Sequence, residues 1–320
     1  MSGYAFYDLL PPQHGMLDEV MNGLALPQKE IQPKYFYDAR GCRLFESICD
    51  LPEYYPTRTE LAIMRSDAQA MAEVLGPECC VIEIGCGNSE KTRLLLEALH
   101  PLEFVAVDIA REQLETSCSR LEKSFAGVSI VALRADFARP VALPVDGLRQ
   151  ARRRVLYFPG STIGNFTQAQ AREFLGRWAK TLGPGGGALI GVDLKKDTAV
   201  LEAAYNDAQG VTAEFNLNIL AHLNHEFGAD FDVHAFRHRA FYNAGHSRIE
   251  MHLVSSNDQK VTIGGRNFSF RTHETIHTES SCKYSIPEFQ ELGRAAGYTP
   301  VQCWTDDRRL FSVHYFTLPQ

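Results

Sequence analysis

Two glycines and two acids are spaced along the chain as a nucleoside-binding site would require. Gly85 and Gly87 follow the apolar run CCVIEI and precede a leucine-rich segment, which predicts a buried strand, a tight turn and a helix. Glycine lets the backbone turn sharply and lets a ligand approach it closely. Asn88 or Ser89 is placed to cap the helix. The turn is therefore a candidate nucleotide cradle.

The glycine turn fits neither of two familiar phosphate-binding motifs. A dinucleotide site needs a third glycine where this chain has Glu90. A P-loop needs a glycine directly before the lysine of Lys91-Thr92, and that glycine is missing. NAD and ATP are both disfavoured.

S-adenosylmethionine, which carries no phosphate, suits the pattern better. Asp108 ends the next predicted strand, 21 residues after Gly87, and is placed to accept hydrogen bonds from ribose hydroxyls. Asp136 and Phe137 follow the third predicted strand and offer an acceptor for the adenine amine and a ring to pack on it. Taken alone, each acid is equally consistent with an ordinary polar residue at the end of a strand. Their occurrence at successive strand ends favours S-adenosylmethionine.

Strands and helices are expected to alternate through the middle of the chain, which predicts an α/β fold with a parallel, Rossmann-like sheet. The expected strands include 103–108, 128–134, 154–158 and 188–194, and two more close the chain. Between about 195 and 283 the alternation pauses, which indicates an inserted α+β subdomain. We expect one domain from 57–195 plus 284–320 and a second from 1–56 plus 196–283.

Composition excludes several classes of protein. The 320 residues carry a net charge of -7 without a long basic run, so we expect no nucleic-acid partner. No stretch approaches the roughly 20 apolar residues of a membrane span, and no signal segment is visible, so we expect a cytoplasmic protein without membrane contact. Eight cysteines without C-x-x-C spacing indicate reduced, mostly buried thiols.

The segment from His273 to His277 matches H-E-x-x-H, a zinc motif when it lies on a helix. Its β-branched context favours a strand, on which the two histidines would lie about 13 Å apart. That distance is too long for two ligands of one zinc ion. We therefore expect no metal.

Longer motifs carry more specific information. The chain contains FYDARG, LPEYYPTR, EIGCGNSEKTRLLL, PGSTIGNF, AAYNDAQGVTAEFNLNIL, LNHEFGADFD, RIEMHL and ESSCKYS. In these segments, which span almost its whole length, it resembles the L-histidine Nα-methyltransferases of ergothioneine biosynthesis. The resemblance implies a class I methyltransferase sheet with a substrate-binding subdomain, S-adenosylmethionine as methyl donor and L-histidine as substrate. It also implies trimethylation of the α-amine to give hercynine. We expect a monomer.

The resemblance also implies roles for individual residues. Asn165 would contact the amine that receives the methyl group, and Tyr55 and Tyr205 would hold the carboxylate. Glu279 and Ser281 would read the imidazole, and Met251 would line its pocket. Asn165 and Tyr55 are the expected catalytic residues. The cofactor would be bound by Gly85, Gly87, Lys91, Asp108, Asp136, Phe137 and Gly160.

The chain departs from the family pattern in a few places. Cys86 and Asn88 replace an expected serine and threonine, and Pro159 replaces a common leucine, but the backbone contacts of the turn are preserved. Glu279 is retained, whereas relatives acting on indole substrates lack that acid. Two alternatives stay open, an N-methyltransferase for another amino acid or amine and a cofactor-binding module without activity.

Overall fold

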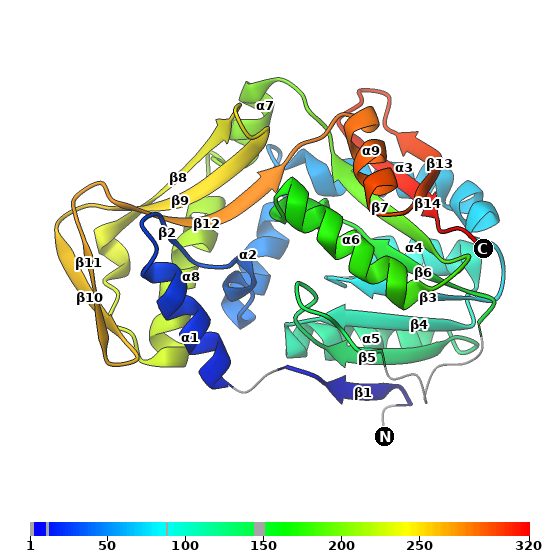
Figure 1. The fold of residues 1–320 in the computed structure, drawn as a ribbon, viewed down its shortest axis with the longest axis horizontal. Helices are drawn as coiled ribbons and strands as arrows, with labels where there is room; N and C mark the ends of the chain where they lie inside the picture. Colours follow the sequence, from blue (N-terminus) through cyan, green and yellow to red (C-terminus); the bar gives the residue numbers. More distant parts are fainter. Residues whose placement is uncertain (1–2, 11–12, 88, 144–150) are drawn as a thin grey trace. The chain divides into compact units, whose positions relative to one another are not determined.

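The computed structural model describes residues 3–10, 13–87, 89–143 and 151–320 (Figure 1). The chain divides into two compact units. Unit 1 comprises Met1–Leu10, Pro56–Lys195 and Cys282–Gln320, and unit 2 comprises Pro11–Tyr55 and Lys196–Ser281.

Unit 1 is built on an eight-stranded sheet. Its strands are β1 (Ala5–Asp8), β3 (Cys79–Ile84), β4 (Glu103–Asp108), β5 (Ser129–Arg134), β6 (Arg153–Phe158), β7 (Gly187–Asp193), β13 (Thr299–Thr305) and β14 (Phe311–Thr317). Their order is β1-β5-β4-β3-β6-β7-β14-β13. Neighbours from β1 to β7 pair in parallel, whereas β14 is antiparallel to both β7 and β13. The predicted parallel sheet is confirmed.

Helices cover both faces of this sheet, so its central strands are buried on both sides (Figure 1). Side chains of α3 (Tyr55–Leu75), α4 (Glu90–Leu99) and α5 (Arg111–Ser124) pack into the core of one face. Side chains of α6 (Gln168–Leu182) and α9 (Ile286–Ala295) pack into the core of the other. Burial from both faces explains why CCVIEI is nearly continuously apolar rather than alternating.

The strand order reverses at β3, which lies between β4 and β6. In open α/β sheets ligands bind beyond the carboxyl ends of the strands at such a switch point. Gly85 follows β3, Asp108 ends β4, and Gly160 precedes the short helix η3 (Thr162–Asn165) shortly after β6. The topology thus brings three of the expected cofactor residues to one edge of the sheet.

Unit 2 is α+β, as expected for the inserted part. Its four-stranded sheet has the order β2-β12-β9-β8, from β2 (Lys29–Glu30), β12 (Thr275–Cys282), β9 (Arg248–Ser255) and β8 (Phe236–Asn243). A separate hairpin pairs β10 (Gln259–Ile263) with β11 (Arg266–Phe270). The helical elements are α1 (Gln13–Leu24), η1 (Pro33–Phe36), α2 (Ala39–Cys49), α7 (Thr198–Ala203), α8 (Val211–Phe227) and η4 (Val233–Ala235).

The two units differ from the expected domains at the amino-terminal end. Residues 3–10 were expected with the substrate-binding part, but they lie in unit 1 because β1 adds a parallel strand to β5, with Ala5 opposite Val131. A four-residue strand with mixed burial gives little periodic signal, and its backbone hydrogen bonds decide its place. The other boundaries, at Pro56 and Cys282, lie close to the expected 57 and 284.

Across the part of the chain that the structure describes, no helix combines the length and the apolar character that a bilayer span requires.

Candidate active site

The glycine turn after β3 has the conformation that only glycine adopts readily. Gly85 has φ of +74° and Gly87 has φ of +44°, both in the left-handed region. A Cβ atom added at either position would meet nothing within 4 Å, so conformation rather than crowding requires glycine here. The Gly87 carbonyl accepts hydrogen bonds from Gln113 Nε2 at 2.8 Å and Ser117 Oγ at 2.7 Å. The turn is therefore fixed to α5 and has open space beside it.

Ser89 does not cap α4 in the expected way. It stands at the N-cap position with φ of 62°, and its side chain accepts no hydrogen bond from the helix. Its hydroxyl instead donates to the Cys86 carbonyl at 3.4 Å, back into the glycine turn. Asn88, the other candidate cap, lies outside the described residues. The hydroxyl thus stabilises the turn rather than the helix.

Asp108 is locked to the glycine turn. Its Oδ2 accepts from the Cys86 amide at 3.1 Å, and its Oδ1 accepts from the Ala110 amide at 2.9 Å. Burial raises the pKa of Asp108, and the hydrogen bond from Ala110 is the largest influence opposing that rise. The structure thus brings Asp108 and the turn together, and contact of Asp108 with a ribose stays a prediction.

Asp136 and Phe137 follow β5, at the same edge of the sheet. Asp136 Oδ1 accepts from the Ala138 amide at 3.0 Å, which holds the carboxylate at the strand end. The Phe137 ring meets the Phe158 ring edge to face, with centroids 5.8 Å apart. The backbone places both residues as an adenine site would need, and their contact with adenine stays a prediction.

A carboxylate that was not among the expected site residues joins two that were. Glu60, on α3, is fully buried. Its Oε2 lies 2.6 Å from Lys91 Nζ and accepts from the Gly160 amide at 2.9 Å. Glu60 precedes the buried Ile63 and Met64 by three and four residues, so it lies on the apolar face of α3. This spacing is the signal in the sequence that points to Glu60 as a buried acid.

A second buried carboxyl lies below the glycine turn. Glu83, on β3, accepts from Thr92 Oγ1 at 2.6 Å. Burial raises the pKa of Glu83 to about 8, which the hydrogen bond from Thr92 and the charge of Lys91 only partly oppose. Glu83 is therefore largely a neutral acid at pH 7.

In unit 2, Tyr55 has a cationic partner. Lys196 Nζ donates to the Tyr55 hydroxyl at 2.7 Å and lies 4.3 Å from the centre of the tyrosine ring. Tyr55 is almost completely buried. Lys196 was not among the expected site residues, because nothing in local spacing relates residue 55 to residue 196.

Two other expected substrate residues of unit 2, Tyr205 and Glu279, interact with Tyr54. The rings of Tyr54 and Tyr205 meet edge to face with centroids 6.4 Å apart. Burial raises the pKa of Tyr54 well above its usual value, and the charges of Tyr205 and Glu279 add to the rise. Glu279 therefore lies close enough to Tyr54 to act on it electrostatically. The expected pocket residues Met251 and Ser281 are buried.

The H-E-x-x-H segment is not helical. His273 is exposed and precedes β12, and His277 lies on that strand, as the β-branched context indicates. His277 has different neighbours, Glu250 and His252, with possible ligand atoms of the three within 4.8 Å of one another. Arg248 already neutralises Glu250, with Nη2 at 2.7 Å from its Oε1. His252 Nε2 also lies 3.1 Å from Glu250 Oε2, so Glu250 has partners on both of its oxygens.

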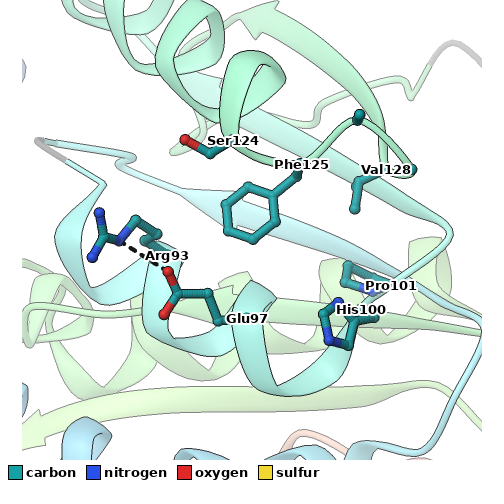
Figure 2. Close-up of a pocket in the computed structure, with 9 residues that line it drawn as sticks. Arg93, Glu97, His100, Pro101, Ser124, Phe125 and Val128 are labelled. Atoms are coloured by element: carbon teal, nitrogen blue, oxygen red, sulfur yellow. Dashed lines mark ion pairs between the residues drawn. The ribbon is translucent and has the colours of Figure 1, made fainter.

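A hollow of about 490 Å³ lies elsewhere in unit 1, between the ends of α4 and α5 (Figure 2). It is lined by Arg93, Glu97, His100, Pro101 and residues 124–128. Residues 100–101 and 124–128 of this lining directly precede β4 and β5. They therefore lie at the amino ends of these strands, whereas the expected cofactor residues lie at the carboxyl ends. None of the expected site residues lines it.

Comparison with known proteins identifies relatives of the chain by sequence and by structure. The chain is 40% identical over 302 residues to a histidine N-alpha-methyltransferase of Mycobacterium tuberculosis, covering 92% of each chain. It is 32% identical over 297 residues to the ergothioneine biosynthesis protein 1 of Neurospora crassa, covering 87% of this chain and 32% of that protein. A solved structure of a putative methyltransferase from Thermobifida fusca matches with a TM-score of 0.51 at 10% identity, covering 93% and 98% of the two chains.

The structural match supports the class I methyltransferase fold alone, since its sequence identity is low. The sequence matches go further. The model of the histidine-specific, S-adenosylmethionine-dependent methyltransferases matches residues 16–318, which is nearly the whole chain. The chain therefore belongs to the family of histidine-specific, S-adenosylmethionine-dependent methyltransferases.

Proposed function

We propose that this enzyme transfers three methyl groups from S-adenosylmethionine to the α-amine of L-histidine and so forms hercynine, the trimethylated betaine of the ergothioneine pathway. The observation that carries the choice of substrate is the match of residues 16–318 to the histidine-specific methyltransferases. Within unit 2, the charge of Glu279 acts on Tyr54, whose ring meets that of Tyr205. We assign Glu279 to the imidazole, because a carboxylate accepts a hydrogen bond from an imidazole N–H.

The cofactor would be bound by residues of unit 1. The open, left-handed glycine turn allows close approach of the backbone, and Asp108 keeps an acceptor for the ribose hydroxyls. Asp136 and Phe137 would hold the adenine. Lys91 and Gly160, which both contact Glu60, are the remaining expected cofactor-binding residues.

The substrate would be recognised at three places. Asn165, at the end of η3, would contact the α-amine. Tyr55 and Tyr205 would hold the carboxylate, and the ammonium of Lys196 on the Tyr55 hydroxyl would favour that anion. Glu279 and Ser281 would form hydrogen bonds with the imidazole, and Met251 would line its pocket.

The reaction is a direct displacement. The amine nitrogen forms a bond to the methyl carbon while the bond from that carbon to the sulfonium sulfur breaks, leaving S-adenosylhomocysteine. The enzyme contributes mainly position, with the reacting atoms held about 3 to 3.5 Å apart. The amine must first lose a proton, which we assign to water. Methylation ends at the quaternary nitrogen because it has no lone pair.

The proposal requires neither a metal ion nor a second copy of the chain. The sulfonium is already a strong leaving group, so no Lewis acid is needed. We expect the purified enzyme to act as a monomer and to keep its activity after treatment with a chelator.

Mass spectrometry of histidine incubated with the protein and S-adenosylmethionine tests the proposal. A product carrying three added methyl groups is expected, together with three equivalents of S-adenosylhomocysteine. The same assay with a panel of other amino acids and amines distinguishes methylation of histidine from methylation of another substrate. Recovery of histidine without added methyl groups contradicts the proposal.

A further inference from the structure

A buried asparagine connects the elements that carry the expected substrate residues of unit 2. Asn216 lies on α8 and is fully buried. Its Nδ2 lies 2.9 Å from His238 Nδ1 and donates to the His252 carbonyl at 3.1 Å. Its Oδ1 accepts from Thr278 Oγ1 at 2.7 Å. Both amide protons and the carbonyl oxygen are thus used by three different strands, β8, β9 and β12.

This amide fixes the tautomer of His238. Because Asn216 Nδ2 is a donor, His238 Nδ1 must accept, and its proton then resides on Nε2. That Nε2 lies 2.9 Å from the Tyr205 carbonyl and donates to it. Burial lowers the pKa of His238, which keeps the ring neutral as this arrangement requires. Asn216 therefore acts on the backbone of Tyr205 through His238.

The same amide acts on the strands that carry Met251 and Glu279. The Thr278 hydroxyl lies 2.7 Å from Asn216 Oδ1 and 3.1 Å from the Met251 carbonyl, so one hydroxyl proton is divided between two acceptors. Thr278 directly precedes Glu279 on β12 and is buried. The Thr278 hydroxyl thus joins β12 both to the Met251 carbonyl on β9 and to Asn216 on α8.

We propose that Asn216 is a positioning residue for substrate binding, which sets the backbone of Tyr205 through His238 and the backbones of Met251 and Glu279 through Thr278. The inference rests on the proposed function and deepens it, because it explains how three residues from separate segments are held in one geometry. Asn216 is not expected to touch the substrate.

The expected effect falls on substrate binding and leaves cofactor binding intact. Asn216→Ala leaves His238 free to adopt either tautomer and leaves the Thr278 hydroxyl without one acceptor. Loss of a hydrogen bond that orients a binding group corresponds to about a tenfold change in KM. We therefore expect the KM for histidine to rise about tenfold or more, with the Kd for S-adenosylhomocysteine within about twofold of the wild type.

Asn224→Ala is the matched control. Asn224 also lies on α8, and its amide makes two hydrogen bonds to the backbone of Phe231, each at 2.8 Å. Its loss removes two hydrogen bonds from the same helix, against three for Asn216, without involving Tyr205, Met251 or Glu279. The KM for histidine should stay at the wild-type value.

Two variants of His238 separate positioning from general stability. His238→Gln keeps an amide N–H that can donate to the Tyr205 carbonyl, so it should recover most of the affinity for histidine. His238→Leu has no donor and should match the rise in KM of Asn216→Ala. A KM for Asn216→Ala equal to that of the wild type, or equal effects of Asn216→Ala and Asn224→Ala, overturns the proposal.

The experiment first determines which amino acid the wild type methylates, and all variants are then compared on that substrate. Turnover of a different amino acid contradicts the proposed function alone, since Tyr205 would still hold its carboxylate. Turnover of histidine with an unchanged KM in Asn216→Ala contradicts this inference alone. No turnover of any amino acid contradicts both.

Discussion

The ammonium of Lys91 lies 2.6 Å from a carboxylate oxygen of Glu60, whose second contact is the Gly160 amide at 2.9 Å. Lys91 lies in the first turn of α4, after the glycine turn, and Gly160 belongs to the PGSTIGN loop, so one buried side chain joins both. Their relative position in unit 1 is therefore set by α3 as well as by the sheet.

Replacement of Glu60 should weaken both stability and cofactor binding. Glu60→Ala leaves the Gly160 amide and a mostly buried ammonium without this partner, and breaking a buried pair costs about 3 kcal/mol or more. We expect the melting temperature to fall by roughly 5 to 10 °C and the Kd for S-adenosylmethionine to rise about tenfold. Differential scanning calorimetry and isothermal titration calorimetry measure these two effects.

The control for Glu60 is Glu97→Ala. Glu97 pairs with Arg93 at 3.2 Å, but both side chains are exposed, and surface pairs contribute about 1 kcal/mol or less. A drop in melting temperature as large as that of Glu60→Ala would contradict the role assigned to Glu60.

Asp108→Ala should reduce affinity for the cofactor. The carboxylate is expected to hold the ribose hydroxyls, and its removal also frees the Cys86 and Ala110 amides. We expect the Kd for S-adenosylmethionine to rise about tenfold to a hundredfold, measured by calorimetry. Glu115→Ala, which removes an exposed acid of α5, should leave the Kd unchanged. An unaltered Kd in Asp108→Ala would remove Asp108 from the ribose site.

Glu279→Ala should raise the KM for histidine strongly and relax selectivity toward other aromatic amino acids. Without the carboxylate, the imidazole of histidine loses its hydrogen-bond acceptor. An apolar aromatic side chain is then penalised less, because there is no longer a carboxylate that it would leave without a hydrogen-bond donor. Steady-state kinetics with histidine, phenylalanine and tryptophan measure the change. Glu274→Ala removes a nearby acid that pairs with Lys29, and it should leave selectivity as it is. Unchanged histidine kinetics in Glu279→Ala would refute the assignment.

The ionisation of Glu83 should lower the free energy of unfolding as pH rises. Its folded pKa of about 8 lies above the ordinary value of 4.5, so the folded state holds a proton that the unfolded state releases. Stability is therefore fully present below pH 4.5 and declines as pH rises toward 8. Glu83→Gln imitates the neutral acid, and we expect its free energy of unfolding to decline less between pH 6 and 8. Urea titrations at several pH values test this, and equal slopes for both proteins would contradict it.

His314 should have the opposite dependence at lower pH. Burial lowers its folded pKa to about 3, whereas an unfolded histidine titrates near 6.5. The unfolded state therefore binds the extra proton first, and stability falls as pH decreases below 6.5, by at most about 1.4 kcal/mol per pH unit. His314→Phe should reduce this slope between pH 6.5 and 5. His273→Asn, at an exposed position, should not, and a slope that His314→Phe leaves unchanged would exclude the assignment.

Much of unit 1 was predictable because its signals are local. The strand Glu103–Asp108 has the expected bounds, since its apolar run and its terminal acid lie within one short segment. The helix α6 likewise has a local start signal, a capping box at Thr167. In unit 2, α7 and α8 are separate helices because Asp207 and Gly210 form a turn between them.

The supporting residues of the site were not predictable in the same way. Glu60, Lys196 and Asn216 contact residues that are distant along the chain, and no spacing rule relates them. Ser89 has a residue type suited to a cap, but a left-handed backbone turns its hydroxyl toward Cys86. Tertiary packing decides both cases, and a single sequence does not contain that information.

The sheet order has a consequence for synthesis of the protein. β14 is the last strand along the chain, yet it lies between β7 and β13. A growing chain therefore presents β7, whose seven residues are all buried in the finished sheet, as an unpaired edge until residues 311–317 leave the ribosome. All of unit 2 has been made by then, since it ends at Ser281. Unit 2 can thus complete its fold on the ribosome first, while the edge of β7 still lacks the strand that pairs with it.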